Sequence, residues 1–336
     1  MDINILWLIV AFGSGAFGAA IGPQTAFIFT GFAYLFGLGG LIATGADNAA
    51  AGQFIATVAF GPVFGPHIAW AGGAAGTAYA AKKGYIESGR MVDLPLAGIA
   101  KMDVLIVAGV FGTGGYLFER VLHLIPSFAT NDGTVIGWTD TVAFTVVLSH
   151  VLARVLFGVK SRKVFGPFPN GRPLVLDDGS HWVEHQEKWS LSAGHGFFSG
   201  LVFAFAAVWL IVTFPNNAEI QGRAFLIGWA VSALTLIFLS CGLKTPVTHH
   251  MTIIAALAAV IMMRIQLQGG GSIGAATPTQ MVIAVLFGAV FGAISGLVGE
   301  LLSRLMNARG DTHIDPPALA IFSLTTLLFA VQSLAM

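Results

Sequence analysis

Long apolar segments alternate with short polar ones along the whole chain. Each apolar run has about 20 residues, enough for a helix to cross the roughly 30 Å hydrocarbon layer of a bilayer. The pattern predicts helices over 4–21, 24–42, 46–62, 66–81, 101–125, 135–158, 193–214, 222–243, 246–266, 279–306 and 316–335. We therefore expect an all-α polytopic membrane protein with ten or eleven transmembrane helices, since the first two runs form either two spans or one broken element.

One long hydrophilic stretch, residues 159–191, divides the chain. It predicts a first transmembrane half over 1–158, a cytoplasmic hydrophilic linker over 159–191 and a second transmembrane half over 192–336. Cytoplasmic loops of membrane proteins carry an excess of Lys and Arg.

The basic residues give this chain an orientation. When the 82–100 loop is placed in the cytoplasm, thirteen of the 16 Lys and Arg residues fall inside, and three, Arg120, Arg223 and Arg264, fall outside. The 159–191 loop is then cytoplasmic and the C-terminus lies outside. We expect a multi-pass protein of a prokaryotic-type inner or plasma membrane.

Composition supports the membrane class. Hydrophobic residues make up 56% of the chain and charged residues only 10%, whereas soluble domains carry roughly 25% charged residues. The formal net charge is zero, so the composition gives no sign of a nucleic-acid partner. The single cysteine, Cys241, cannot form an intrachain disulfide.

The two halves resemble each other at an offset of about 180 residues. Val110-Phe111-Gly112 matches Val290-Phe291-Gly292, and Gly65-Pro66-His67 lies opposite Thr245-Pro246-Val247. Equivalent loops fall on opposite sides in the charge count, which predicts an inverted repeat of five plus five spans. Such repeats are typical of channels and transporters that bind solute near the membrane midplane.

Prolines interrupt the apolar runs at equivalent places in the halves. Pro62, Pro66 and Pro246 each remove a backbone donor and predict broken or re-entrant helices. Irregular backbone at membrane depth is tolerated where protein or a water-filled cavity surrounds it. The alternative is an ordinary turn outside the membrane at each proline.

Polar residues near these breaks are the candidates for a solute path or for proton coupling. His67, His249 and His250 follow the breaks, and histidine titrates near neutral pH. The alternative places these rings at the membrane interface, bonded to loop carbonyls.

Asp47 and Asn48 precede a predicted span, where they either cap a helix or bind a cation or proton. Gln53 lies one or two turns deeper and is expected to face the bundle interior. Asp140, His150 and Arg154 are ionisable residues of a predicted span and are candidates by the same argument.

The densest polar cluster is the loop that carries Asp311, His313 and Asp315. Two carboxylates and an imidazole can bind a divalent cation or gate the cytoplasmic mouth. Because Asp315 precedes Pro316, a helix cap in a solvated loop is the simpler interpretation, and we predict no metal and no cofactor.

Small residues recur at helical spacing and predict close helix packing, within the chain or between copies in a homo-oligomer. They are Gly288, Gly292 and Gly296, Gly18 and Gly22, and Gly72 and Gly76.

The sequence thus favours a membrane channel or secondary transporter whose partners are the lipid bilayer and a small-molecule or ion solute. The alternatives are a structural or anchoring subunit of a larger membrane complex and, third, a membrane-embedded enzyme using His and Asp. The chain has no Walker A, HExxH or CxxC sequence, so we expect no enzymatic activity.

Overall fold

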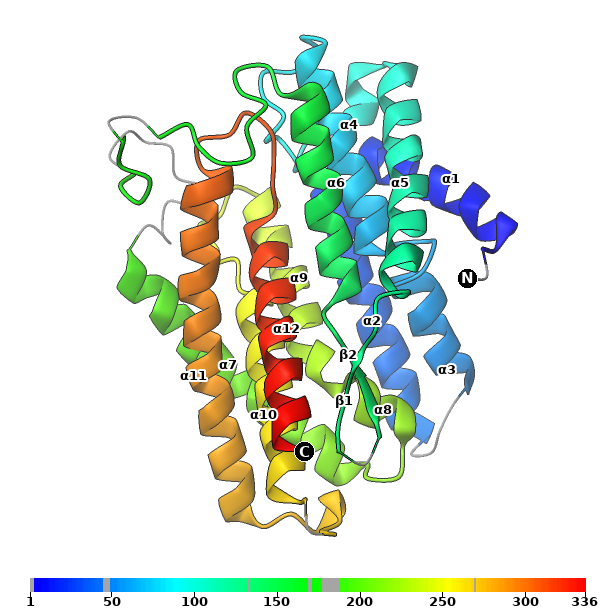
Figure 1. Cartoon of the computed structure of the whole chain (residues 1–336). Helices are drawn as coiled ribbons and strands as arrows, with labels where there is room; N and C mark the ends of the chain where they lie inside the picture. The colour runs from blue at the N-terminus through cyan, green and yellow to red at the C-terminus, as the bar shows by residue number, and fades with distance from the viewer. Residues whose placement is uncertain (1–2, 45–48, 132, 169–170, 177–187, 269) are drawn as a thin grey trace.

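The structure is a computed structural model that describes residues 3–44, 49–131, 133–168, 171–176, 188–268 and 270–336. It is mostly helical, as the sequence predicts (Figure 1). Seven helices among the described residues are long and apolar enough to cross a membrane: Pro23–Thr44, Met102–Leu122, Trp189–Thr213, Ala218–Ser240, His249–Gln266, Pro278–Asn307 and Pro316–Ala335. Three apolar helices are shorter: Ile5–Ile21, Ala49–Ala59 and Thr141–Phe157. These lengths suit a membrane protein.

The elements of the first half are α1 (Ile5–Ile21), α2 (Pro23–Thr44), α3 (Ala49–Phe54), the π-helical turns η1 (Ile55–Ala59) and η2 (Pro66–Trp70), α4 (Ala71–Lys82), η3 (Leu96–Ile99), α5 (Met102–Leu122), β1 (Phe128–Ala129), β2 (Val135–Gly137) and α6 (Thr141–Phe157). Those of the second half are α7 (Trp189–Thr213), α8 (Ala218–Arg223), η6 (Ala224–Leu226), α9 (Ile227–Ser240), α10 (His249–Gln266), η7 (Ile273–Ala275), α11 (Pro278–Leu302), η8 (Ser303–Asn307) and α12 (Pro316–Ala335).

Helices of the same half pack mainly on one another. In the first half, α1 and α4 pack against α5, and α6 lies beside α4. In the second half, α7 and α10 pack against α11, and α12 lies beside α10. The halves meet where α2 contacts α9 and α6 contacts α12. In Figure 1, α4, α5 and α6 of the first half lie toward the upper right, and α7, α10 and α11 of the second half lie toward the lower left.

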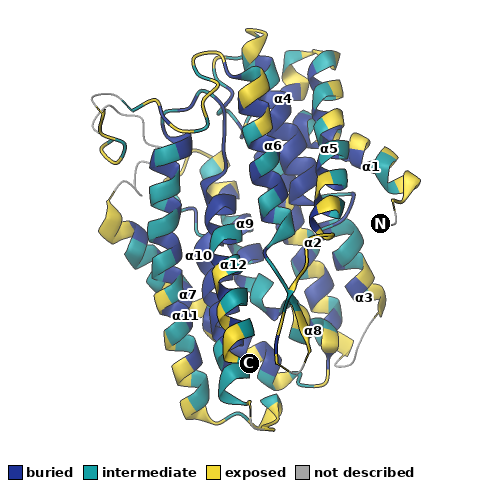
Figure 2. Ribbon diagram, viewed as in Figure 1, coloured by how far each residue is buried: buried dark blue, intermediate teal, exposed yellow. Residues whose placement is uncertain are grey.

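Helix α10 lies at the centre of the second half. Its side chains are buried on nearly every face, and Figure 2 shows burial concentrated where the helices face one another. A helix that is apolar all round must be enclosed by other elements, and α7, α9, α11 and α12 enclose α10.

Glycines bring the helices of each half into close contact. Gly15 of α1 meets Ala108 and Gly112 of α5, and Gly292 of α11 meets the backbone of Gly196 in α7. Because these glycines lack a Cβ, the helix backbones approach one another directly. The predicted small-residue faces therefore pack within the chain.

Gly22 is the exception among those predicted positions. It ends α1 with φ +98, and its amide bonds Ala19 O at 3.2 Å. Glycine adopts such a positive φ without the strain that a Cβ would add. The first two apolar runs are therefore two helices joined by a tight turn.

Three local expectations were wrong. The predicted helix over 135–158 begins only at Thr141, because Val135–Gly137 form strand β2, which pairs antiparallel with β1. The second apolar half begins its helix at Trp189 rather than at residue 193. Gln53 is exposed instead of facing the interior, and its amide donates to Thr57 Oγ1, one turn on, at 2.8 Å.

The close packing can be tested on one helix with a matched pair of glycines. A Cβ at Gly112 would lie 2.5 Å from Ala11 O, whereas one at Gly114 would meet nothing within 4 Å. We expect Gly112→Ala to destabilise the protein by ~1–3 kcal/mol, as overpacking does. Gly114→Ala should be neutral or slightly stabilising, because alanine favours helix. Thermal unfolding of both variants in detergent checks this, and equal melting temperatures would contradict the assigned contact.

Candidate functional site

Four helices begin at one place inside the bundle. They are η2, which starts at Pro66 and continues as α4, and α6, α10 and α12. The start of each helix lines the same cavity. Non-helical chain leads into every one of them, including residues 60–65 and 241–248. Pro62 and Pro246 lie in these non-helical stretches, and Pro66 is the first residue of η2.

Side chains of α1 and α2 bond the backbone exposed at the first break. Thr30 Oγ1 donates to Phe64 O at 2.6 Å, and Ser14 Oγ donates to Val63 O. The Gly65 amide bonds Gly61 O at 3.0 Å. Unpaired peptide groups are expensive in an apolar interior, so these bonds allow the break to persist there.

Two of the four helix starts carry a carboxylate cap. Asp140 Oδ1 accepts from the amide of Ala143 at 2.8 Å at the start of α6. Asp315 Oδ2 accepts from the amide of Ala318 at 3.0 Å at the start of α12. Each carboxylate satisfies a free amide and lies at the positive end of its helix dipole.

The cavity has a volume of about 220 Å³ and an aromatic and acidic wall, and we call it the central cavity. Its lining residues are Phe27, Phe60, Pro66, Trp70, Asp140, Val142, Ala143, Val146, Leu226, Trp229, His249, Ile253, Asp315, Ala318 and Ile321. They come from both halves of the chain. A largely apolar cavity with a few convergent polar groups is the usual form of a small-molecule site.

A second, smaller cavity of about 40 Å³ lies against the first. Gln24, Val92 and Leu239 line only this second cavity. Phe27, Trp70, His249 and Asp315 line both cavities, and we call these four side chains the partition. The Phe27 ring lies 5.8 Å from that of Trp70 and 5.0 Å from that of His249.

Behind the partition lies a buried polar cluster. Asp315 Oδ1 is 3.3 Å from His313 Nε2, and the Asp315 amide donates to His150 Nδ1 at 3.3 Å. The rings of His150 and His313 both lie edge-on to Trp70, at 5.7 and 5.4 Å between centroids. The capping role expected for Asp315 is confirmed, but its loop is buried rather than solvated.

Arg154 explains why that loop is buried. Its guanidinium is fully enclosed and donates to Thr312 Oγ1 at 2.9 Å and to the carbonyls of Met306 and Thr312. Arg90 adds a bond to Ala308 O at 2.6 Å, and burial lowers the pKa of its guanidinium. A buried cation with several carbonyl partners holds a loop firmly.

Asp311 makes different contacts from His313 and Asp315. Its carboxylate accepts from the amides of Val159 and Lys160, both at 2.6 Å, and so anchors the chain after α6. The three residues predicted as one mouth therefore belong to two places. Among the described residues, no group of three or more His, Cys, Asp or Glu side chains is arranged to hold a metal ion.

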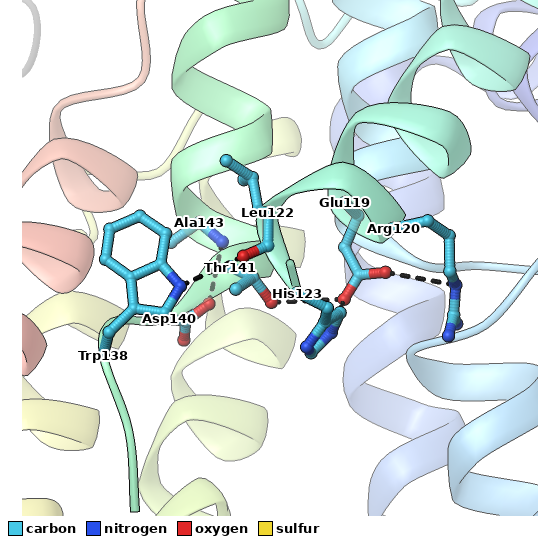
Figure 3. A network of polar contacts seen from close by, with 8 residues as sticks. All are labelled: Glu119, Arg120, Leu122, His123, Trp138, Asp140, Thr141 and Ala143. Atoms are coloured by element: carbon cyan, nitrogen blue, oxygen red, sulfur yellow. Dashed lines mark hydrogen bonds and ion pairs between the residues drawn. The ribbon is translucent and has the colours of Figure 1, made fainter. Parts of the chain in front are cut away.

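A second polar network supports the start of α6 (Figure 3). Glu119 Oε1 accepts from Thr141 Oγ1 at 3.1 Å and contacts His123, while its other oxygen lies 3.4 Å from Arg120 Nε. Trp138 Nε1 donates to Leu122 O at 3.2 Å. The end of α5 thus holds the segment that places Asp140 at the cavity.

The structure separates the predicted histidines. His249 lines the central cavity. The carbonyl of His67 packs against Gly115 of α5, and the imidazole of His250 packs against Gly299 of α11. Neither of these two side chains lines the central or the second cavity. Both histidines are buried, one in each half of the chain.

Of the other predicted site residues, Gln53 faces outward and does not reach the central cavity. Asp47 and Asn48 lie outside the described residues.

Sequence reasoning missed most of the cavity wall. Phe27, Trp70 and Trp229 line the central cavity, yet nothing in their spacing separates them from the other aromatic residues of the chain. Asp140 did carry a signal, because an Asp before an apolar run is typical of a helix cap.

The capping role of Asp140 makes a direct prediction. Asp140→Ala removes the acceptor for the Ala143 amide and should lower the free energy of unfolding by about 1 kcal/mol. Asp140→Asn should leave it nearly unchanged, because asparagine caps helices as well as aspartate does. Thermal unfolding in detergent measures both. Equal losses for the two variants would mean that charge, rather than capping, stabilises this helix start.

Comparison with known proteins identifies the family of this chain. No curated protein and no solved structure matches the chain. A family described only as a family of unknown function, DUF7973, matches residues 1–171 and 175–336. These two segments cover almost the whole chain, so the protein belongs to the DUF7973 family.

Proposed function

We propose that this protein is an integral membrane transporter that carries a small solute through the central cavity. The observation that supports this is the meeting of four helix starts from both halves around one cavity, in a bundle of membrane-length helices. Interrupted helices around a site at mid-depth are the usual construction of secondary transporters. Non-helical backbone inside a membrane requires such protein or cavity surroundings.

A carrier fits the cavities better than an open channel. The two cavities share the partition of Phe27, Trp70, His249 and Asp315. In a carrier, such a partition separates the two sides of the membrane while the solute occupies one cavity. Rocking of one half against the other would then expose the solute to the opposite side.

We also propose that the halves form an inverted repeat of five crossings each. In support, α1, α4 and α5 contact one another as α7, α10 and α11 do, and α6 stands to α4 as α12 stands to α10. In this arrangement, α3–η1 and η2–α4 together make one interrupted crossing, so the chain crosses the membrane ten times. The basic residues put the 82–100 and 159–191 loops in the cytoplasm and the C-terminus outside.

A solute path can be tested before the solute is known. In a Cys241→Ser background, Ala143→Cys places a thiol in the central cavity. We expect a charged, membrane-impermeant thiol reagent to label it in proteoliposomes, because a solute path must admit water. Ala207→Cys, buried in α7 and not lining that cavity, is the matched control and should stay unlabelled. An unlabelled Ala143→Cys would indicate a dry interior and favour an anchoring subunit.

The inverted arrangement has its own test. Ile86→Cys and Ser272→Cys place thiols in loops that the repeat makes equivalent but puts on opposite sides. In the same cysteine-free background, we expect an impermeant reagent added to intact cells to label Ser272→Cys only. Permeabilisation of the cells should then allow the reagent to label Ile86→Cys. Labelling of both from the same side would exclude the inversion and leave the path test unaffected.

A further inference from the structure

We propose that the central cavity binds a small organic cation, with its alkylated nitrogen among the aromatic rings and its charge facing Asp140 and Asp315. This assignment gives the solute class for the proposed transport and rests on it for its physiological meaning. Three observations carry it: the charges in the cavity wall, the arrangement of the aromatic rings, and two polar side-chain atoms that lack a hydrogen-bond partner in the described part of the chain.

The charges of the wall favour a cation. Asp140 and Asp315 both line the cavity, and none of the described lining residues is Lys or Arg. The helix starts oppose this preference, since each carries roughly half a positive charge. At α6 and α12, however, the carboxylates themselves cap that charge, and a full carboxylate outweighs a partial one. Of the two other starts, η2 begins with Pro66, which has no amide hydrogen to offer an anion.

Four aromatic rings line the same cavity as these carboxylates. The Phe27 ring lies 5.8 Å from that of Trp70 and 5.2 Å from that of Trp229, and Phe60 lies 5.3 Å from Trp229. The rings are tilted or edge-on to one another rather than stacked. Rings set at angles present faces to a common space, as the aromatic cages that hold alkylated ammonium groups do.

Two buried polar atoms in the wall lack a hydrogen-bond partner among the described residues. They are Nε1 of Trp70 and Nδ1 of His249, in side chains that are 6% and 4% exposed. An unpaired buried donor is unfavourable until something bonds it. An oxygen on the solute would accept from Trp70 Nε1, so a cation that also carries a hydroxyl group fits this wall best.

Choline binding by the purified full-length protein tests the inference. Choline has an alkylated nitrogen and a hydroxyl, and 3,3-dimethylbutan-1-ol has the same shape without the charge. We expect saturable choline binding by isothermal titration in detergent, and binding of the uncharged isostere at least about tenfold weaker. Stronger or equal binding of the isostere, or binding of acetate in preference to choline, would overturn the assignment.

Variants tie the binding to the cavity. Asp140→Asn and Asp315→Asn keep a helix cap while removing the charge, and Trp229→Leu removes a ring. Each should weaken choline binding at least about tenfold. Asp93→Asn and Trp209→Leu change an exposed acid and an outward-facing ring, and both should bind as the native protein does. Unchanged affinity in all three cavity variants would place any choline elsewhere.

The path test separates this inference from the transport proposal. Choline should protect Ala143→Cys from the impermeant reagent, whereas the isostere at the same concentration should not. If the thiol is labelled but choline never protects it, the transport proposal stands and the organic-cation proposal is wrong. If the thiol is never labelled but the protein still binds choline on titration, the transport proposal is wrong and the organic-cation binding site stands.

Discussion

The fold depends on satisfying backbone hydrogen bonds at four helix starts within an apolar bundle. A helix start leaves amides without intrahelical partners, and an apolar interior offers no water to bond them. In this chain, side chains bond the backbone groups that lack a helical partner. Asp140 and Asp315 cap their own helices, while Ser14 and Thr30 bond carbonyls of the 60–65 break. Of these four side chains, the two aspartates also line the central cavity.

Rigid supports hold these helix starts in place. The glycine contacts of α1 with α5 and of α7 with α11 leave little room for one helix to slide on another. The Glu119 network fixes the segment before α6, and Arg154 fixes the loop before α12. Although these two supports differ in chemistry, both place an aspartate at the cavity. If the halves move during transport, the contacts between α2 and α9 and between α6 and α12 are where they must adjust.

The buried side chain of Arg154 explains why the 306–312 loop lies inside the bundle. A guanidinium in an apolar interior is costly unless its donors are paired. Residues 306–312 supply those acceptors, so the loop lies inside the bundle, with His313 against Trp70 and Asp315 at the central cavity. The loop's polar sequence suggested solvent, because sequence composition does not reveal a buried cation more than 150 residues away.

The sequence by itself determined the mostly helical class, the membrane-length helices and the cap at Asp315. These follow from local chemistry: apolar length and a carboxylate before a helix. Only the tertiary structure decided that four helix starts meet, that His249 faces the cavity while His67 and His250 do not, and that Gln53 faces outward. The physical reason is that helices such as α10 are apolar on every face, so no polar stripe along the sequence tells which side chains point inward.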